Sequence, residues 1–160
     1  MSQEVLAELR ASAPRRWIGV AIMATLGGLL IYIAVAVPPA TVLWQGFLLL
    51  LGGLSLWLAE ATRRATELTL TLTEEGIVDS TGETVAEIAQ IDGVSRGTFA
   101  FKPSNGFVLS LKTRGEGRWR PGLWWRAGKR VGIGGVTPGP QGKMMAQMIE
   151  ALIAGRPVDD

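Results

Sequence analysis

The amino-acid sequence predicts an α+β membrane protein, in which a transmembrane helical hairpin precedes a small antiparallel β-barrel capped by a C-terminal helix. Three observations support this prediction. Two apolar runs, residues 17–37 and 41–58, contain no Asp, Glu, Lys or Arg and are separated by only three residues. Leu and Thr then alternate over residues 68–73, which is the two-residue period of a half-buried strand. Near the end of the chain, apolar residues recur at helical spacing.

Each apolar run is close to the roughly 20 residues that an α-helix needs to cross the hydrocarbon core of a bilayer. The linker between them is only Pro38-Pro39-Ala40, so the two helices are predicted to form a hairpin. Ala34-Val35-Ala36 resembles the cleavage site of a signal peptide. However, the first run is longer than the apolar region of such a peptide, and a second apolar run follows at once. We therefore favour a transmembrane hairpin.

The charges that flank the hairpin predict its orientation. Arg10, Arg15 and Arg16 precede the first apolar run, Arg63 and Arg64 follow the second, and the linker carries no charge. By the positive-inside rule, both termini are cytoplasmic. Arg outnumbers Lys by 12 to 4, and Ala and Gly are abundant, which favours a high-GC bacterial source. The predicted location is therefore the bacterial inner membrane.

The chain is predicted to have three segments: a cytoplasmic N-terminal segment at residues 1–16, the transmembrane hairpin at 17–60, and a small cytoplasmic domain at 66–155. In the first segment, a helix over residues 2–13 would place Val5, Leu6 and Leu9 on one side. Two interpretations stay open for this stretch. It is either a short helix that anchors at the membrane interface or a frayed terminus before Pro14.

The cytoplasmic domain is predicted to consist of short strands separated by turns. After the Leu–Thr strand, strand-like segments cover residues 77–78, 84–85, 94–101, 107–112, 118–125 and 129–135. Turn residues separate them at 74–76, 80–82, 104–106 and 115–117. Ser104-Asn105-Gly106 is a strong hairpin signal.

The C-terminal helix has predicted start and stop signals. Thr137 is the expected N-cap, with Pro138 just inside the helix, and Gly155 and Pro157 end it. Its apolar stripe consists of Met144, Met145, Met148, Ile149, Leu152 and Ile153. A Met-rich stripe can form an adaptable binding groove, but we favour a core position for this one.

Particular segments of the domain resemble the bacterial PH-like family. Residues 68–77 resemble the first hairpin of that family, and the glycine-rich residues 132–135 before Thr137-Pro138 resemble its last strand. The resemblance covers about residues 66–154 and implies a PH-like β-barrel closed by a helix. Membrane members of the family place this domain after two transmembrane helices, a layout similar to that of assembly factors of photosynthetic complexes. The resemblance implies no catalytic residues.

The composition excludes several kinds of chemistry. The 160 residues include no Cys and no His, so zinc sites built on thiolate or imidazole and Ser-His-Asp catalysis are excluded. The carboxylates do not form a pair beside a base, so we expect no enzyme activity and no cofactor. The net charge of +2 gives no signal for nucleic-acid binding. The apolar runs hold no ionisable residue, which disfavours transport by this chain alone.

The charges of the domain are sorted along the sequence. Residues 67–92 contain seven acidic and no basic residues, whereas residues 112–130 contain seven basic residues and one acidic residue. The basic stretch includes a segment that we predict to be an exposed partner-binding patch, made of Arg118, Trp119, Arg120, Trp124, Trp125 and Arg126. A turn at Pro121-Gly122 would lift the indoles out of the fold.

Three interpretations of this segment stay open. Arg and Trp are enriched where proteins bind one another, and they also suit anionic lipid headgroups at a membrane surface. Alternatively, one or two of the indoles belong to the core and the charges form an ordinary solvated face.

Small residues predict how the two transmembrane helices contact each other. Gly27 and Gly28 in the first run and Gly52 and Gly53 in the second lie at nearly the same depth of an antiparallel hairpin. Small residues let helix backbones approach closely in lipid, and Ala24 extends the first small face by one turn. The leucines of residues 48–51 would then face lipid or a partner.

The expected function is that of a non-catalytic accessory, stabilising or assembly subunit of a larger integral membrane complex. The alternative is a membrane-anchored sensor of anionic phospholipid headgroups. No nucleic-acid partner is expected.

Overall fold

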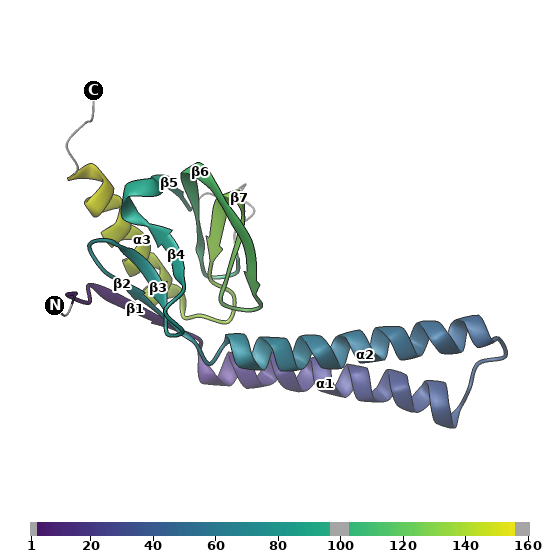
Figure 1. Ribbon diagram of the computed structural model, residues 1–160. Helices are drawn as coiled ribbons and strands as arrows, with labels where there is room; N and C mark the ends of the chain where they lie inside the picture. The colour runs from purple at the N-terminus through teal and green to yellow at the C-terminus, as the bar shows by residue number, and fades with distance from the viewer. Residues whose placement is uncertain (1–2, 97–102, 156–160) are drawn as a thin grey trace. The chain divides into compact units, whose positions relative to one another are not determined.

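The computed structural model describes residues 3–96 and 103–155, and Figure 1 shows their arrangement into helices and sheets. The chain divides into two compact units. The hairpin unit is Ala13–Arg64, and the sheet unit consists of Met1–Ser12 together with Ala65–Asp160. The N-terminal segment therefore belongs to the same unit as the C-terminal domain, although the hairpin separates the two in sequence.

The hairpin unit contains two helices, α1 (Ala13–Ala36) and α2 (Val42–Ala65). Both are long and apolar enough to cross a membrane. In the most apolar stretch of each helix, only 11% of α1 and 17% of α2 is buried. The core helix of a soluble protein would be mostly buried. The two predicted apolar helices are thus confirmed, and both extend beyond the uncharged runs into their flanking arginines.

The sheet unit contains two antiparallel sheets and one long helix. The first sheet has the order β1 (Ala7–Arg10), β2 (Thr69–Leu72), β3 (Gly76–Asp79) and β4 (Thr84–Glu87). After the short 3-10 helix η1 (Ile88–Gln90), the second sheet has the order β5 (Ile91–Ser95), β6 (Phe107–Arg120) and β7 (Trp124–Ile133). The helix α3 (Gly139–Ala154) follows. The α+β layout is confirmed, and the described strands form two sheets and no closed barrel.

Strand β1 corrects both predictions for the N-terminal segment. Residues 2–13 were expected to form a surface helix or a frayed end, but β1 pairs with β2 through Ala7–Leu72 and Leu9–Leu70. Ala7 and Leu9 are buried, whereas Glu8 and Arg10 are exposed, which is the period of a strand. The helical interpretation was wrong because four residues of alternation carry a weak signal until the partner strand is known.

Several strand predictions are confirmed. Leu70 and Leu72 of β2 are fully buried, whereas Thr69 and Thr71 are half-buried. The segments at residues 77–78 and 84–85 lie in β3 and β4. The strand predicted over residues 94–101 lies partly outside the described residues. The turn predicted at 115–117 is wrong, because β6 continues through it.

The β6–β7 hairpin is strongly irregular. Its register shifts on both sides of the Gly115–Gly128 pair. The Gly134 amide donates to the Leu123 carbonyl at 2.8 Å, and the Val136 amide donates to the Gly122 carbonyl at 3.1 Å. The tip of the β6–β7 hairpin therefore folds back onto the residues that follow β7. The turn around Gly122 was predicted to lift the indoles out of the fold, but it does not project into solvent.

Helix α3 closes the core. Met145, Ala146 and Ile149 are fully buried, and Met148 and Leu152 pack against the same core. The predicted core stripe is confirmed except at Met144, which is 47% exposed. The predicted Thr137 cap is wrong: the N-cap is Pro138, which makes no side-chain cap, and Thr137 is buried. The helix packs against β1 and β5, one edge strand from each sheet.

The burial of β1 leads to a stability prediction. Leu9→Ala should lower the free energy of unfolding of the sheet unit by about 2–5 kcal/mol, because it leaves a cavity in the core. Val5→Ala is the matched control, since Val5 is 52% exposed and its loss should cost less than about 0.5 kcal/mol. Thermal unfolding of the detergent-solubilised full chain, followed by near-UV circular dichroism, measures both. Equal tolerance of the two variants would contradict the placement of β1 in the core.

Candidate functional site

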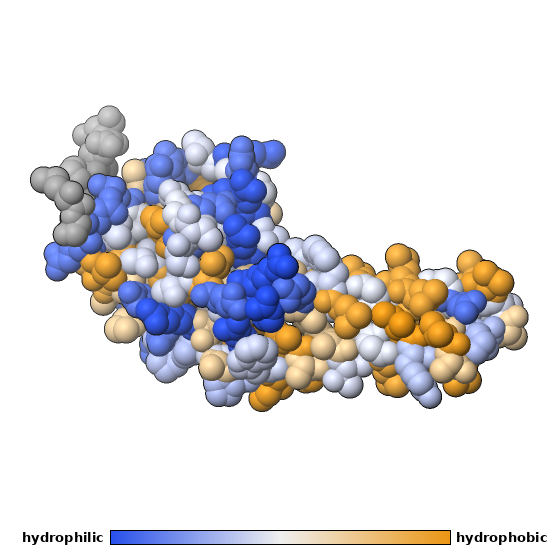
Figure 2. Space-filling view, turned by 60° about the horizontal axis from the view of Figure 1, so that its bottom comes forward, coloured by the Kyte–Doolittle hydropathy of each residue, from blue (hydrophilic) through white to orange (hydrophobic). Residues whose placement is uncertain are grey.

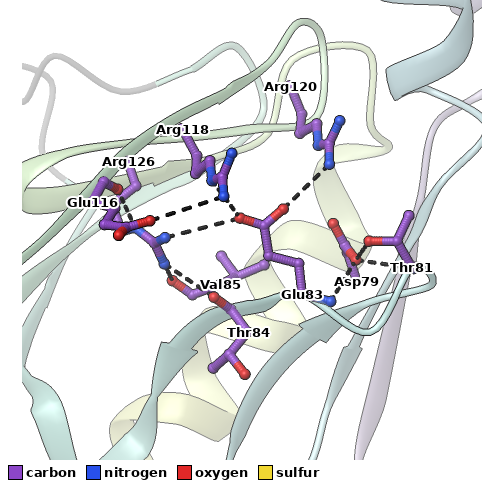
Figure 3. A network of polar contacts seen from close by, with 9 residues as sticks. All are labelled: Asp79, Thr81, Glu83, Thr84, Val85, Glu116, Arg118, Arg120 and Arg126. Carbon is purple, nitrogen blue, oxygen red and sulfur yellow. Dashed lines mark hydrogen bonds and ion pairs between the residues drawn. The ribbon is translucent and has the colours of Figure 1, made fainter.

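Three arginines of the predicted partner-binding patch converge on one carboxylate (Figure 3). Arg118 Nε lies 3.0 Å from Glu83 Oε1, Arg120 Nη2 lies 3.2 Å from Glu83 Oε2, and Arg126 Nη2 lies 3.9 Å from Glu83 Oε1. Arg118 and Arg126 face each other across β6 and β7. Like charges placed opposite each other are destabilising, so Glu83 offsets a repulsion that the strand register creates.

Arg126 is a structural residue, because its side chain bonds to main-chain carbonyls. Its Nη1 donates to the Thr84 and Val85 carbonyls at 3.0 and 3.1 Å, and its Nε donates to the Glu116 carbonyl at 2.6 Å. The side chain is only 14% exposed. Since β4 and β7 are edge strands of different sheets, the guanidinium of Arg126 joins the two sheets where no backbone ladder does.

A tight turn that begins at the buried Asp79 places Glu83. Asp79 at the end of β3 is 4% exposed, and its Oδ1 accepts hydrogen bonds from the amides of Thr81 and Glu83 at 2.9 and 3.1 Å. The Thr81 hydroxyl donates to the same oxygen. An Asp that bonds the backbone in this way stabilises a tight turn. The acidic residues of the β3–β4 connection therefore have a structural role toward the arginines of the next sheet (Figure 3).

The three tryptophans of the predicted patch have different environments. Trp124 is 1% exposed and belongs to the core, with the Arg126 guanidinium 5.8 Å from its ring. Trp125 is half-buried and covers Gly132, where a Cβ would come within 2.2 Å of the indole. Only Trp119, at 56%, is largely exposed. The prediction of an exposed patch is therefore wrong for Trp124, because the tip of the hairpin folds back into the core, and for Arg126, whose side chain is only 14% exposed.

What remains of the patch is a shallow hollow on one face of the β6–β7 hairpin. Trp119 and Trp125 are a directly opposed cross-strand pair, so their side chains project from the same face. With Gly117, Ala127 and the neighbouring arginines they line a hollow of about 430 Å³. An exposed indole beside such a hollow suits a protein contact.

The other four basic residues of the stretch 112–130 do not share the contacts of Arg118, Arg120 and Arg126. Lys112, Arg114, Lys129 and Arg130 are exposed on β6 and β7. Within residues 3–96 and 103–155, none of these four side chains forms an ion pair or a side-chain hydrogen bond. The sequence places all seven basic residues in one stretch. It therefore does not distinguish the three arginines that have ion-pair partners from the four residues that have none within the described residues.

One glycine of each predicted pair lies in the seam between the two helices, and the other does not. Gly27 and Gly52 face each other: a Cβ on Gly27 would lie 2.9 Å from the Gly52 carbonyl oxygen, and one on Gly52 would lie 3.0 Å from that of Gly27. Gly28 and Gly53 are exposed and have no atoms within 4 Å of such a Cβ. Their predicted place in the seam is therefore wrong. Ala24 is half-buried.

Polar contacts join the two helices along the seam. The Ser55 hydroxyl donates to the Met23 carbonyl at 2.8 Å, the Gln45 amide donates to the Ala34 carbonyl at 2.9 Å, and Arg16 donates to the Arg63 carbonyl at 3.3 Å. The outward face is apolar, as Figure 2 shows for one side of the hairpin. Of the four leucines expected to face lipid or a partner, Leu49, Leu50 and Leu51 are exposed and Leu48 is half-buried.

The described residues offer little else that could hold a ligand. A hollow of about 660 Å³ lies beside β3 and β4 and is lined in part by Glu74, Glu75 and Glu87. No group of three or more Asp or Glu side chains in the described part of the chain could share a metal ion. The glycines at 132 and 135 serve close packing, against Trp125 and Gly122. No protein-family model, curated protein or solved structure matches this chain.

The seam of the hairpin gives a paired prediction. Gly27→Leu and Gly52→Leu should each lower the stability of the hairpin by about 1–3 kcal/mol, because the new side chain meets the other helix. Gly28→Leu and Gly53→Leu add the same volume to the outward face and should change stability by less than about 0.5 kcal/mol. Thermal unfolding in mild detergent compares the four variants. A larger effect at Gly28 or Gly53 would show that the helices are rotated relative to the observed seam.

Proposed function

We propose that this protein is a membrane-anchored, non-catalytic accessory or assembly subunit of a larger complex in the bacterial inner membrane. The observation that carries the proposal is the hairpin. Gly27, Gly52, Ser55 and Gln45 make the contacts between its two helices, and many of its large apolar side chains are exposed. In lipid, polar groups must be satisfied internally, and an apolar exterior suits hydrocarbon or the helices of a partner.

The sheet unit supports a binding role. The arginines nearest to Trp119 are held by Glu83 and by main-chain carbonyls, so they form a rigid support for the indole. Rigid aromatic anchors bind partners at a low cost in conformational entropy. We propose Trp119 and its hollow as the contact with the partner complex.

We further propose that the sheet unit is a PH-like domain. One four-stranded and one three-stranded antiparallel sheet, followed by a helix that packs between their edges, support this proposal. The first strand would then come from the segment that precedes the membrane hairpin.

The pairing of β1 with β2 supports a hairpin whose ends lie on the same side of the membrane. Arg10 and Thr69 are register partners, although one precedes both helices and the other follows them. Two paired residues cannot lie on opposite sides of a bilayer. The arginines at both ends of the hairpin favour the cytoplasmic side, so we propose that the sheet unit is cytoplasmic.

The docking proposal predicts a complex that depends on Trp119. After gentle detergent solubilisation, native electrophoresis should show the full chain in a species of much higher mass. Trp119→Ala should weaken that complex at least tenfold, because aromatic anchors contribute about 2 kcal/mol or more at interfaces. Met144→Ala is the control, since Met144 is also an exposed apolar residue but lies on α3. Migration of the wild-type chain only as a small free species would contradict the subunit proposal.

The orientation proposal can be tested with single cysteines, because the chain has none of its own. In intact cells, an impermeant thiol reagent should label Ala40→Cys in the helix linker. It should not label Glu4→Cys or Gln147→Cys, which lie in the sheet unit, until the cells are lysed. Labelling of the last two without lysis would place the sheet unit on the other side of the membrane.

A further inference from the structure

The four free basic residues of β6 and β7 form one cluster, which we call the cationic patch: Lys112, Arg114, Lys129 and Arg130. Arg130 pairs with Ser110 across the two strands, and the next pair in the ladder is Gly115–Gly128. Lys112, Arg114 and Lys129 all lie in the irregular stretch between these two pairs. The register shift therefore brings four cations from two strands to the same part of the sheet.

The patch lacks the counter-charge that the neighbouring arginines have. Arg118, Arg120 and Arg126 share Glu83, and Arg118 also lies 3.9 Å from Glu116. Strands β5–β7 contain only two acidic residues, Asp92 and Glu116. Neither forms an ion pair with the patch within the described residues. Adjacent like charges repel one another, so an anion that binds at the patch would relieve this repulsion.

We propose that the cationic patch binds the anionic phospholipid headgroups of the membrane that carries the hairpin. This inference rests on the proposed insertion of the hairpin. Only residues 11–12 lie between β1 and α1, and only residues 66–68 lie between α2 and β2, so both connections are short. A compact unit of this size has a radius of gyration of about 13 Å. It therefore stays close to the headgroups at all times.

The chemistry of the patch favours a lipid surface over a specific acidic peptide. Its members are long, flexible, exposed side chains, and the hollows described above are lined by other residues. Diffuse attraction of Lys and Arg to anionic headgroups needs no hollow, and each residue near the surface strengthens binding about fivefold. The contact would be a second, electrostatic anchor that holds the sheet unit against the bilayer, and salt would weaken it.

The test uses the full chain in nanodiscs, with a fluorophore on Ala127→Cys beside the patch and a quencher on the lipid headgroups. In discs that contain phosphatidylglycerol, we expect strong quenching that high salt reduces. In discs of phosphatidylcholine alone, quenching should be weak. Lys129→Gln with Arg130→Gln should lower the equilibrium constant for the quenched state about 25-fold, or fivefold per charge.

The matched control is Arg96→Gln with Lys143→Gln, which removes two exposed charges that lie outside the patch and far in sequence from the ends of the hairpin, and it should leave quenching unchanged. Equal quenching in both kinds of disc, or equal effects of the two double variants, would overturn the lipid contact. If the patch variant instead disrupts the native complex with no lipid dependence, the occupant is an acidic protein surface and the proposal is wrong. Failure of the chain to co-elute with discs would overturn membrane anchoring as well, whereas loss of quenching alone would not.

Discussion

The pairing of β1 with β2 is the constraint on which the rest of the structure depends. It makes the whole helical hairpin a connection between two neighbouring strands of one sheet. Closing so long a connection is entropically unfavourable for a flexible chain. The antiparallel contact of α1 and α2 removes most of that cost, because it already brings the two ends of the hairpin together. In turn, β1 supplies the edge on which α3 packs.

Local periodicity was sufficient to predict some elements but not others. The apolar helices, the Leu–Thr strand and the stripe of α3 carry their signal within one segment. Strand β1 does not, because its partner lies about 60 residues later. Trp124 is buried only because the hairpin tip returns to Gly134 and Val136. The choice between Gly27 and Gly28 depends on how each helix is rotated about its axis, which hydropathy does not determine.

The charged residues of the candidate site show the same limit of prediction from local sequence. The sequence indicated that acidic and basic residues are separated along the chain, and a partner-binding role for the basic stretch stays a prediction. The sequence could not indicate that Glu83 would reach three of the arginines, because this contact needs the β3–β4 turn to meet the β6–β7 hairpin. Sequence position alone therefore assigned Arg118 and Lys112 to one group, whereas the fold gives the first a structural partner and leaves the second exposed.

Arg126 has a consequence for how this domain behaves toward other polypeptides. The exposed edge of a sheet is a template on which a foreign strand can add by main-chain hydrogen bonds. The carbonyls of Thr84 and Val85 are acceptors on such an edge, and the guanidinium of Arg126 already occupies both. Helix α3 covers the edge at β1 in a different way. At β4, a side chain thus occupies acceptors that a neighbouring strand would otherwise use, which makes this edge a poorer template for the strands of another molecule.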